Sequence, residues 1–177
     1  MSFTIDPGNY SGPSGSSRRP DVRDGEKVLW LCGIKMGMTM GGSPKLECCY
    51  VVVHDPDGGN DVKGLVWETF PLTQAAAWKL QQVSQAIGQK TSWEADNEEE
   101  AWRVLGKRPV IAHVVSQPKR NGEGKVARVK RFKMYSEDPS DEMEKIVTDA
   151  EDWHTKWKNK GSSSSGFSST SADDIPF

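Results

Sequence analysis

Apolar residues gather in five short runs rich in β-branched and aromatic side chains, and segments dense in Gly, Pro, Asn and Asp separate these runs. Runs of this length and composition predict β-strands, and the residues between them predict turns. The predicted strands are Val28–Lys35, Leu46–Val53, Val62–Phe70, Val110–Ser116 and Val126–Tyr135.

Three other segments place their apolar residues at helical spacing. Thr73 and Ser140 stand where N-caps belong, and Gly88 stands where a helix ends in the left-handed conformation. In the last segment, acids crowd the start and lysines the end, which suits the helix dipole. The predicted helices are Thr73–Ile87, Glu98–Leu105 and Asp141–Lys158.

The predicted order is three strands, a helix and two strands, which is the element order of the OB-fold. We therefore expect a mainly β protein: a five-stranded OB-fold barrel with a helix between strands three and four and a C-terminal amphipathic helix. Other small β-barrel folds are alternatives that fit the same element order. In an OB-fold the ligand lies across strands two and three, between the loops that join strands one to two and four to five. Here those loops are the Gly- and Met-rich Met36–Pro44 and the basic Gln117–Lys125.

Composition divides the chain into a folded centre and two polar ends. Of the 177 residues only 35% are hydrophobic, and the mean hydropathy of −0.65 is low for a fully packed globule. Ends rich in Gly, Pro and Ser cannot bury enough apolar surface to offset their ordering entropy. We expect a disordered arm over residues 1–24, a folded domain over 25–136, the amphipathic helix within 137–160, and a flexible linker with an acidic tip over 161–177.

A formal net charge of −2 hides a basic centre. From Arg103 to Lys133 the charged residues are basic except for Glu123, whereas Glu94–Glu100 and Glu137–Asp152 are strongly acidic. A one-signed run interleaved with strand residues indicates a surface that attracts polyanions. A solvated charged face is the alternative.

Proteins that bind single strands combine a basic groove with aromatic side chains on which bases stack. Trp67 shares a predicted strand face with Lys63 and is the stacking candidate. Phe132 alternates onto one face with Arg128 and Lys130. For both aromatic residues, core packing is an equal alternative. The candidate DNA-binding residues are Lys35, Lys63, Trp67, Lys107, Arg108, Lys119, Arg120, Lys125, Arg128, Lys130 and Phe132.

The motifs of common enzymes are missing from the sequence. The three histidines have no nucleophile pattern beside them, and no GxxxxGK phosphate loop occurs. Cys32, Cys48 and Cys49 lack metal-ligand spacing and are typical of buried strand residues in a reducing compartment. No apolar run approaches the ~20 residues of a membrane span. We expect no catalytic residues, cofactor, metal or membrane partner, and a cytoplasmic protein.

The last residues, Asp173-Asp174-Ile175-Pro176-Phe177, closely resemble the C-terminal tip of bacterial and phage single-stranded-DNA-binding proteins. Ala172 stands where that family often has a third acid, and the body lacks the family's Asn-rich first strand. Residues 25–136 instead resemble small phage proteins catalogued as a domain of unknown function. The matching pattern is Trp67-Glu68-Thr69-Phe70, a helix to Ile87-Gly88, a short helix to Leu105-Gly106-Lys107-Arg108-Pro109, and a strand after a basic hairpin.

The resemblance implies an OB-fold protein that coats single-stranded DNA during phage replication, recombination and repair, in the cytoplasm of a bacterial host. Its tip, formed by Asp173, Asp174, Ile175, Pro176 and Phe177, would recruit replication and recombination proteins. The sequence leaves open whether the protein forms a homo-oligomer. Two alternatives remain: an RNA-binding protein, and a protein-interaction module whose basic run meets the acidic Asp141–Asp152 segment in the same or a neighbouring chain.

The acidic tip also predicts an effect on DNA affinity. Its carboxylates compete with phosphates for the basic surface while DNA is absent, and salt screens that attraction. Deletion of residues 173–177 should leave the fold intact and raise affinity for single-stranded DNA, most at low salt, in a fluorescence titration. Unchanged affinity would leave the tip as a site for partner proteins alone.

Overall fold

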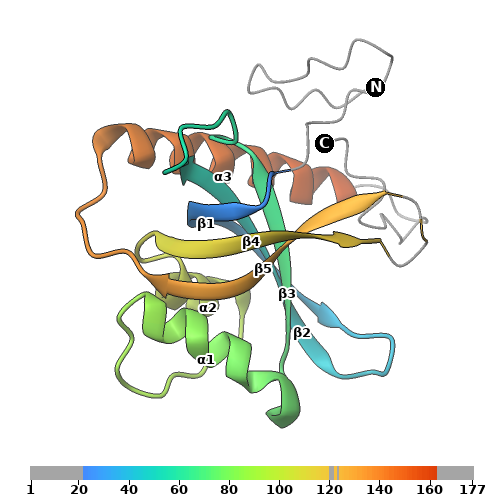
Figure 1. The fold of residues 1–177 in the computed structure, drawn as a ribbon. Coiled ribbons are helices and arrows are strands. Elements are labelled where there is room, and N and C mark those ends of the chain that lie inside the picture. Colours follow the sequence, from blue (N-terminus) through green and yellow to red (C-terminus); the bar gives the residue numbers. More distant parts are fainter. Residues whose placement is uncertain (1–21, 120–121, 123, 163–177) are drawn as a thin grey trace.

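The structure, a computed structural model, describes residues 22–119, 122 and 124–162. Within these residues a strongly bent five-stranded sheet lies between helix α3 on one side and helices α1 and α2 on the other (Figure 1). The elements in chain order are β1 (Gly25–Met38), β2 (Pro44–His54), β3 (Leu65–Pro71), the short 3-10 helix η1 (Gln74–Ala76), α1 (Ala77–Ala86), α2 (Glu98–Leu105), β4 (Val110–Pro118), β5 (Lys125–Met134) and α3 (Asp141–Ser162).

The sheet is antiparallel throughout, with the strand order β3-β2-β1-β4-β5. Strand β1 pairs with β2 along most of its length but with β4 only over Gly25–Leu29. Register shifts between Val28 and Leu29 and between Leu31 and Gly33 interrupt the β1–β2 pairing. Such irregularities bend a strand and increase its twist. The long strand β1 therefore pairs with both β2 and β4, and its irregularities curve the sheet.

The curvature brings the edge strands β3 and β5 near each other, but no backbone ladder joins them. Side chains bridge them instead. The carboxylate Oε2 of Glu68 accepts a hydrogen bond from the Val129 backbone N–H at 2.7 Å. Nη1 of Arg128 donates to the Trp67 carbonyl at 2.8 Å. The mainly β class is thus confirmed, whereas the sheet is open, and a closed OB-fold barrel is not confirmed.

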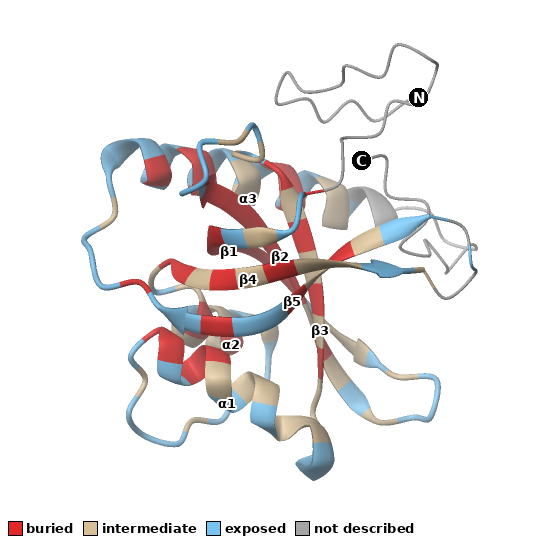
Figure 2. Ribbon diagram, in the orientation of Figure 1, coloured by how far each residue is buried: buried red, intermediate tan, exposed pale blue. Residues whose placement is uncertain are grey.

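Both faces of β1 and β2 are buried, whereas β5 is exposed on one face (Figure 2). Along β2, Cys48, Tyr50 and Val52 join the inner cluster with residues of α1 and α2, whereas Cys49 and Val51 join the outer cluster beneath α3. Alternation of this kind follows from the two-residue period of a strand. It explains why β2 forms one continuous apolar run in the sequence.

The predicted elements are all present, with some changes at their ends. Glu98–Leu105 is a helix as predicted, and Gly88 has the expected positive φ of 81°. Ser140 Oγ accepts a hydrogen bond from the Met143 N–H at 3.3 Å, so the predicted N-cap is confirmed. The predicted helix from Thr73 begins as η1 instead, and the Thr73 side chain makes no capping bond.

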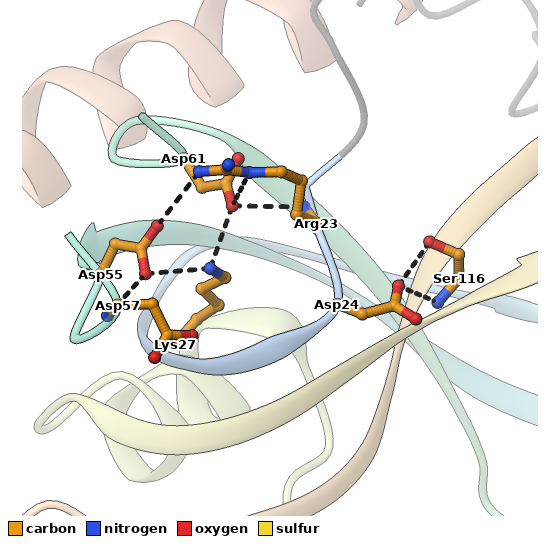
Figure 3. A network of polar contacts seen from close by, with 7 residues as sticks. All are labelled: Arg23, Asp24, Lys27, Asp55, Asp57, Asp61 and Ser116. Carbon is orange, nitrogen blue, oxygen red and sulfur yellow. Dashed lines mark hydrogen bonds and ion pairs between the residues drawn. The ribbon is translucent and has the colours of Figure 1, made fainter. Parts of the chain in front are cut away.

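The boundary of the N-terminal arm is corrected by a buried ion-pair network (Figure 3). Lys27, only 2% exposed, places Nζ 2.9 Å from Asp55 Oδ1 and 3.0 Å from Asp61 Oδ2. Arg23 Nε lies 3.3 Å from Asp61 Oδ2. Burial opposes the charge of Lys27, but the hydrogen bonds to the two carboxylates raise its pKa above the ordinary value. The network ties the start of β1 to the loop between β2 and β3.

Two further contacts order the same segment. Val22 is buried in the inner cluster. Asp24 Oδ1 accepts hydrogen bonds from the backbone N–H of Ser116, at 2.8 Å, and from its hydroxyl, at 2.6 Å (Figure 3). Residues 22–24, which the sequence pattern assigns to the disordered arm, are therefore part of the folded domain. The rest of that arm lies outside the described residues.

The network predicts a large difference between two lysine substitutions. Lys27→Met removes the ammonium from between two shielded carboxylates, and leaving such charges uncompensated costs about 3–5 kcal/mol. Lys133→Met is the matched control, because its 2.7 Å pair with Glu26 is half-exposed on both sides and contributes about 0–1 kcal/mol. Urea unfolding of both variants measures the difference. Equal losses of stability would show that the network does not stabilise the fold.

Candidate nucleic-acid interface

Helix α3 covers the outer face of β1 and β2, and so reaches one of the two strands across which the sequence predicted the ligand. It packs on β1 and β2 through four buried apolar side chains, Met143, Ile146, Val147 and Trp153. Burial of a large apolar side chain contributes ~1.5–3 kcal/mol, so these four stabilise the packing by roughly 6–12 kcal/mol as an upper estimate. A helix held this firmly is a layer of the fold rather than a mobile lid.

Trp67 lies on β3 under the last turns of α3. Its ring centroid is 5.3 Å from that of Trp157 and 5.9 Å from that of His154. Trp157 in turn stacks on Trp153 at 6.3 Å with an interplanar angle of 22°. A base that stacked on Trp67 in this arrangement would have to displace two rings of α3. The contacts therefore favour the packing alternative for Trp67.

His154 is the tightest contact between α3 and the sheet. The imidazole is 4% exposed and lies against Gly33, where the Cβ of any other residue would overlap the ring. Burial, assisted by the positive charge of Lys35, lowers the pKa of His154 to about 4. The imidazole is therefore neutral at pH 7, and the close approach of helix and strand depends on glycine at position 33.

The second aromatic candidate, Phe132, lies in the core. It is 4% exposed, and its ring centroid is 5.9 Å from that of Tyr50 and 6.2 Å from that of Phe70. The expectation that Phe132 shares a face with Arg128 and Lys130 is wrong. A register shift in the β4–β5 pairing inserts one extra residue into β5, so the alternation reverses before Phe132.

The same bulge exposes two cations side by side. Arg131 pairs with His113 and Val129 with Val114, so Lys130 has no partner position on β4. Lys130 and Arg131 are both exposed. Strict alternation along the sequence puts Arg131 on the opposite face and outside the candidate set. The alternating pattern of β5 contains no signal for the bulge, which is why Arg131 was missed.

The other candidate cations divide into surface and structural groups. Lys35, Lys63, Lys107 and Lys125 are exposed, and Lys119 is half-buried at the end of β4. They come from β1, the loop before β3, the turn after α2 and the hairpin between β4 and β5. Arg120 and the predicted partner-binding residues 173–177 lie outside the described residues.

The side chains of Arg108 and Arg128 form hydrogen bonds to backbone carbonyls within the fold. Nη2 of Arg108 donates to the Tyr135 carbonyl at 2.9 Å, which ties β4 to the chain leaving β5. Arg128 bridges β5 to β3 as described above. Both side chains are half-buried. An arginine side chain carries five N–H donors. Each guanidinium therefore has further donors for a hydrogen bond to a phosphate.

The acids of α3 lie apart from the basic strand. Exposed Asp141, Glu142, Glu144, Asp149 and Asp152 follow the outer side of the helix. Among residues 22–119 and 124–162, no ion pair joins this helix to β5. An ion pair instead joins Lys158 of α3 to Glu98 at the start of α2. The contact between acidic helix and basic run that the interaction-module alternative allows within one chain is therefore not seen in the described residues.

The structure offers no metal centre in the part of the chain it describes, where no three His, Cys, Asp or Glu side chains are placed to hold an ion. Cys32, Cys48 and Cys49 are buried, as predicted, and form no disulfide. Burial raises the pKa of the Cys48 thiol well above its usual range. None of the described helices is long and apolar enough to cross a membrane. In comparisons with protein-family models and with curated proteins, nothing matches this chain.

The low pKa of His154 predicts a pH dependence of stability. A histidine with a folded-state pKa of about 4, against about 6.5 in the unfolded chain, stabilises the fold fully above pH 6.5 and loses that contribution as the pH falls toward 4. The free energy of unfolding decreases by about 3 kcal/mol over this pH range. His154→Phe should remove this part of the acid sensitivity in urea unfolding at a series of pH values.

Trp153→Phe is the control, because it alters the same cluster without removing a titratable group. It should lower stability by a similar amount at every pH and keep the parent's pH dependence. The same pH dependence in His154→Phe and the parent would contradict a buried neutral imidazole.

Proposed function

We propose that this protein binds single-stranded DNA without sequence preference, through the cationic surface of β5 and the β4–β5 hairpin. The observation that carries the proposal is the bulge in β5, which presents Lys130 and Arg131 together to solvent. Exposed Lys125 begins the same strand. Interactions with phosphates supply most of sequence-independent binding, and they require cations on the surface in this way.

We also propose that the fold is an open variant of the OB-fold. The order β3-β2-β1-β4-β5, with β3 and β5 brought together, is the OB-fold order opened between those two strands. Glu68 and Arg128 bridge the opening. Helix α1 packs against both β3 and β5, which is where the helix between strands three and four lies in that fold.

The proposed DNA path differs from that of a typical OB-fold. Because α3 occupies the outer face of β1 and β2, a strand would pass over β5 rather than across β2 and β3. Lys63 and Lys107 would extend the path at its ends. The acidic outer side of α3 repels phosphates and so disfavours a path along that helix.

The role of the acidic tip stays a proposal from the sequence. Residues 173–177 would recruit replication, recombination or repair proteins, as the resemblance to phage and bacterial single-stranded-DNA-binding proteins implies. Charge-assisted bonds from a basic partner to the carboxylates, with the Phe177 ring in a pocket, would suit such an end.

A second candidate is a protein-interaction module that binds no nucleic acid. The exposed acids of α3 favour it, because they remain available to the basic run of another copy or to another basic protein. RNA as the ligand would use the same cations as DNA.

Charge reversal on β5 tests the proposal. Lys130→Glu combined with Arg131→Glu should weaken binding of single-stranded DNA by about tenfold or more. The slope of log affinity against log salt should fall by about 0.7 for each phosphate that the variant no longer neutralises. Gel-shift and fluorescence titrations on single strands, duplex DNA and single-stranded RNA measure affinity and slope.

The matched control reverses the same number of charges on α3, with Lys145→Glu and Lys156→Glu at two exposed positions. It should leave DNA affinity nearly unchanged. An equal decrease of affinity in both double variants would mean that net charge alone governs binding. Altered self-association without any DNA binding would favour the interaction module.

A further inference from the structure

Trp67 is half-buried against the rings of α3 and Phe132 is buried in the core, so a single-strand binder needs another aromatic surface. Among the Trp, Tyr and Phe residues that the structure describes, Trp78 is the exposed one, at 58%. It lies in the first turn of α1. An exposed indole next to a cationic surface is what a base needs for stacking.

Two amides continue the same helix face. Gln81 and Gln85 follow Trp78 at positions i+3 and i+7, and both are exposed. Residues at this spacing lie along one side of a helix. The side is therefore aromatic at its start, uncharged and polar beyond, and glutamine amides are among the groups that hydrogen-bond to base edges.

A pocket of about 650 Å³ opens beside this face, and Gln81 and Gln85 line it. Leu46, Leu72 and Leu80 form apolar parts of its lining, and Trp93 also lines it. Trp93 is fixed in place because its Nε1–H donates to Ser84 Oγ at 3.0 Å, and the Ser84 hydroxyl donates to the Leu80 carbonyl at 2.8 Å.

The charged residues around the pocket favour a nucleotide whose base lies in the pocket and whose phosphates lie outside it. Exposed Lys90 lines the mouth, and Lys107 Nζ lies 3.4 Å from Oε1 of Gln89, another lining residue. Glu94 and Asp96 also line the pocket. Carboxylates repel a phosphate but accept hydrogen bonds from the amino groups of bases. A base inside the pocket can donate hydrogen bonds to Glu94 and Asp96, while its flanking phosphates lie near Lys90 and Lys107.

We propose that the Trp78, Gln81 and Gln85 face of α1, together with the pocket beside it, binds nucleobases of a single strand. This inference rests on the proposed function and adds a base-binding site to the phosphate-binding surface of β5. Helix α1 packs against β5, so one strand that leaves β5 reaches the α1 face directly.

Paired oligonucleotides test the base site in the full chain. Trp78→Ala should weaken binding of an oligothymidylate about fivefold or more, the decrease expected for one stacked base. Binding of an abasic deoxyribose-phosphate chain of equal length should not change. Met38→Ala is the control, because it removes a similarly exposed apolar side chain from β1, outside the proposed site, and should alter neither affinity. Equal effects of Trp78→Ala on both ligands, or no effect, would overturn the inference.

A second measurement separates this inference from the proposed function. If the parent chain binds neither oligonucleotide, the proposed function fails, and titration with cytidine then decides the base site alone. The indole N–H resonances of Trp78 and Trp93 should shift in the full-length protein. Unshifted resonances overturn the site, as does a shift caused by an Asp-Asp-Ile-Pro-Phe peptide but not by cytidine, which would make the pocket a peptide site.

Discussion

The carboxylate of Glu68 joins the two edges of the open sheet. One oxygen accepts the Val129 N–H at 2.7 Å, and the other lies 2.8 Å from Nζ of Lys79 on α1. The side chain is 5% exposed, and leaving a buried N–H without a partner costs ~1–3 kcal/mol. This group therefore links β3, β5 and α1, and the Arg128 bond to the Trp67 carbonyl adds a second bridge between β3 and β5. The inner core closes around Tyr50, Phe70 and Phe132 because these three elements meet.

The placement of α3 decides what the rest of the surface is able to do. It covers β1 and β2, packs the rings of His154 and Trp157 against Trp67, and sets His154 against Gly33. The face that a simple OB-fold would offer to a ligand becomes a second core. Cations on β5 and the exposed indole of Trp78 on α1 lie outside the area that α3 packs on, so the proposed site combines groups from β5 and α1 rather than from β2 and β3.

Much of the fold was predictable because local signals agree with tertiary packing. Gly88 and Ser140 end and begin helices as their chemistry requires, and Glu98–Leu105 is a helix at the predicted residues. The site was less predictable. Strand alternation placed Phe132 on one face with Arg128 and Lys130 and placed Arg131 on the opposite face, and a single extra residue in β5 reversed both. A bulge depends on pairing with β4, which no local pattern reveals.

The amino-acid sequence by itself determined the number, kind and order of the strands and helices, the basic centre between acidic flanks, and the buried character of the cysteines. These follow from side-chain period, turn chemistry and charge, which are local properties. Tertiary structure alone decided that the sheet stays open, that α3 covers Trp67, and that Lys27 lies between Asp55 and Asp61. The reason is physical: each depends on contacts between residues distant in the chain, where curvature and burial rather than local pattern select the partner.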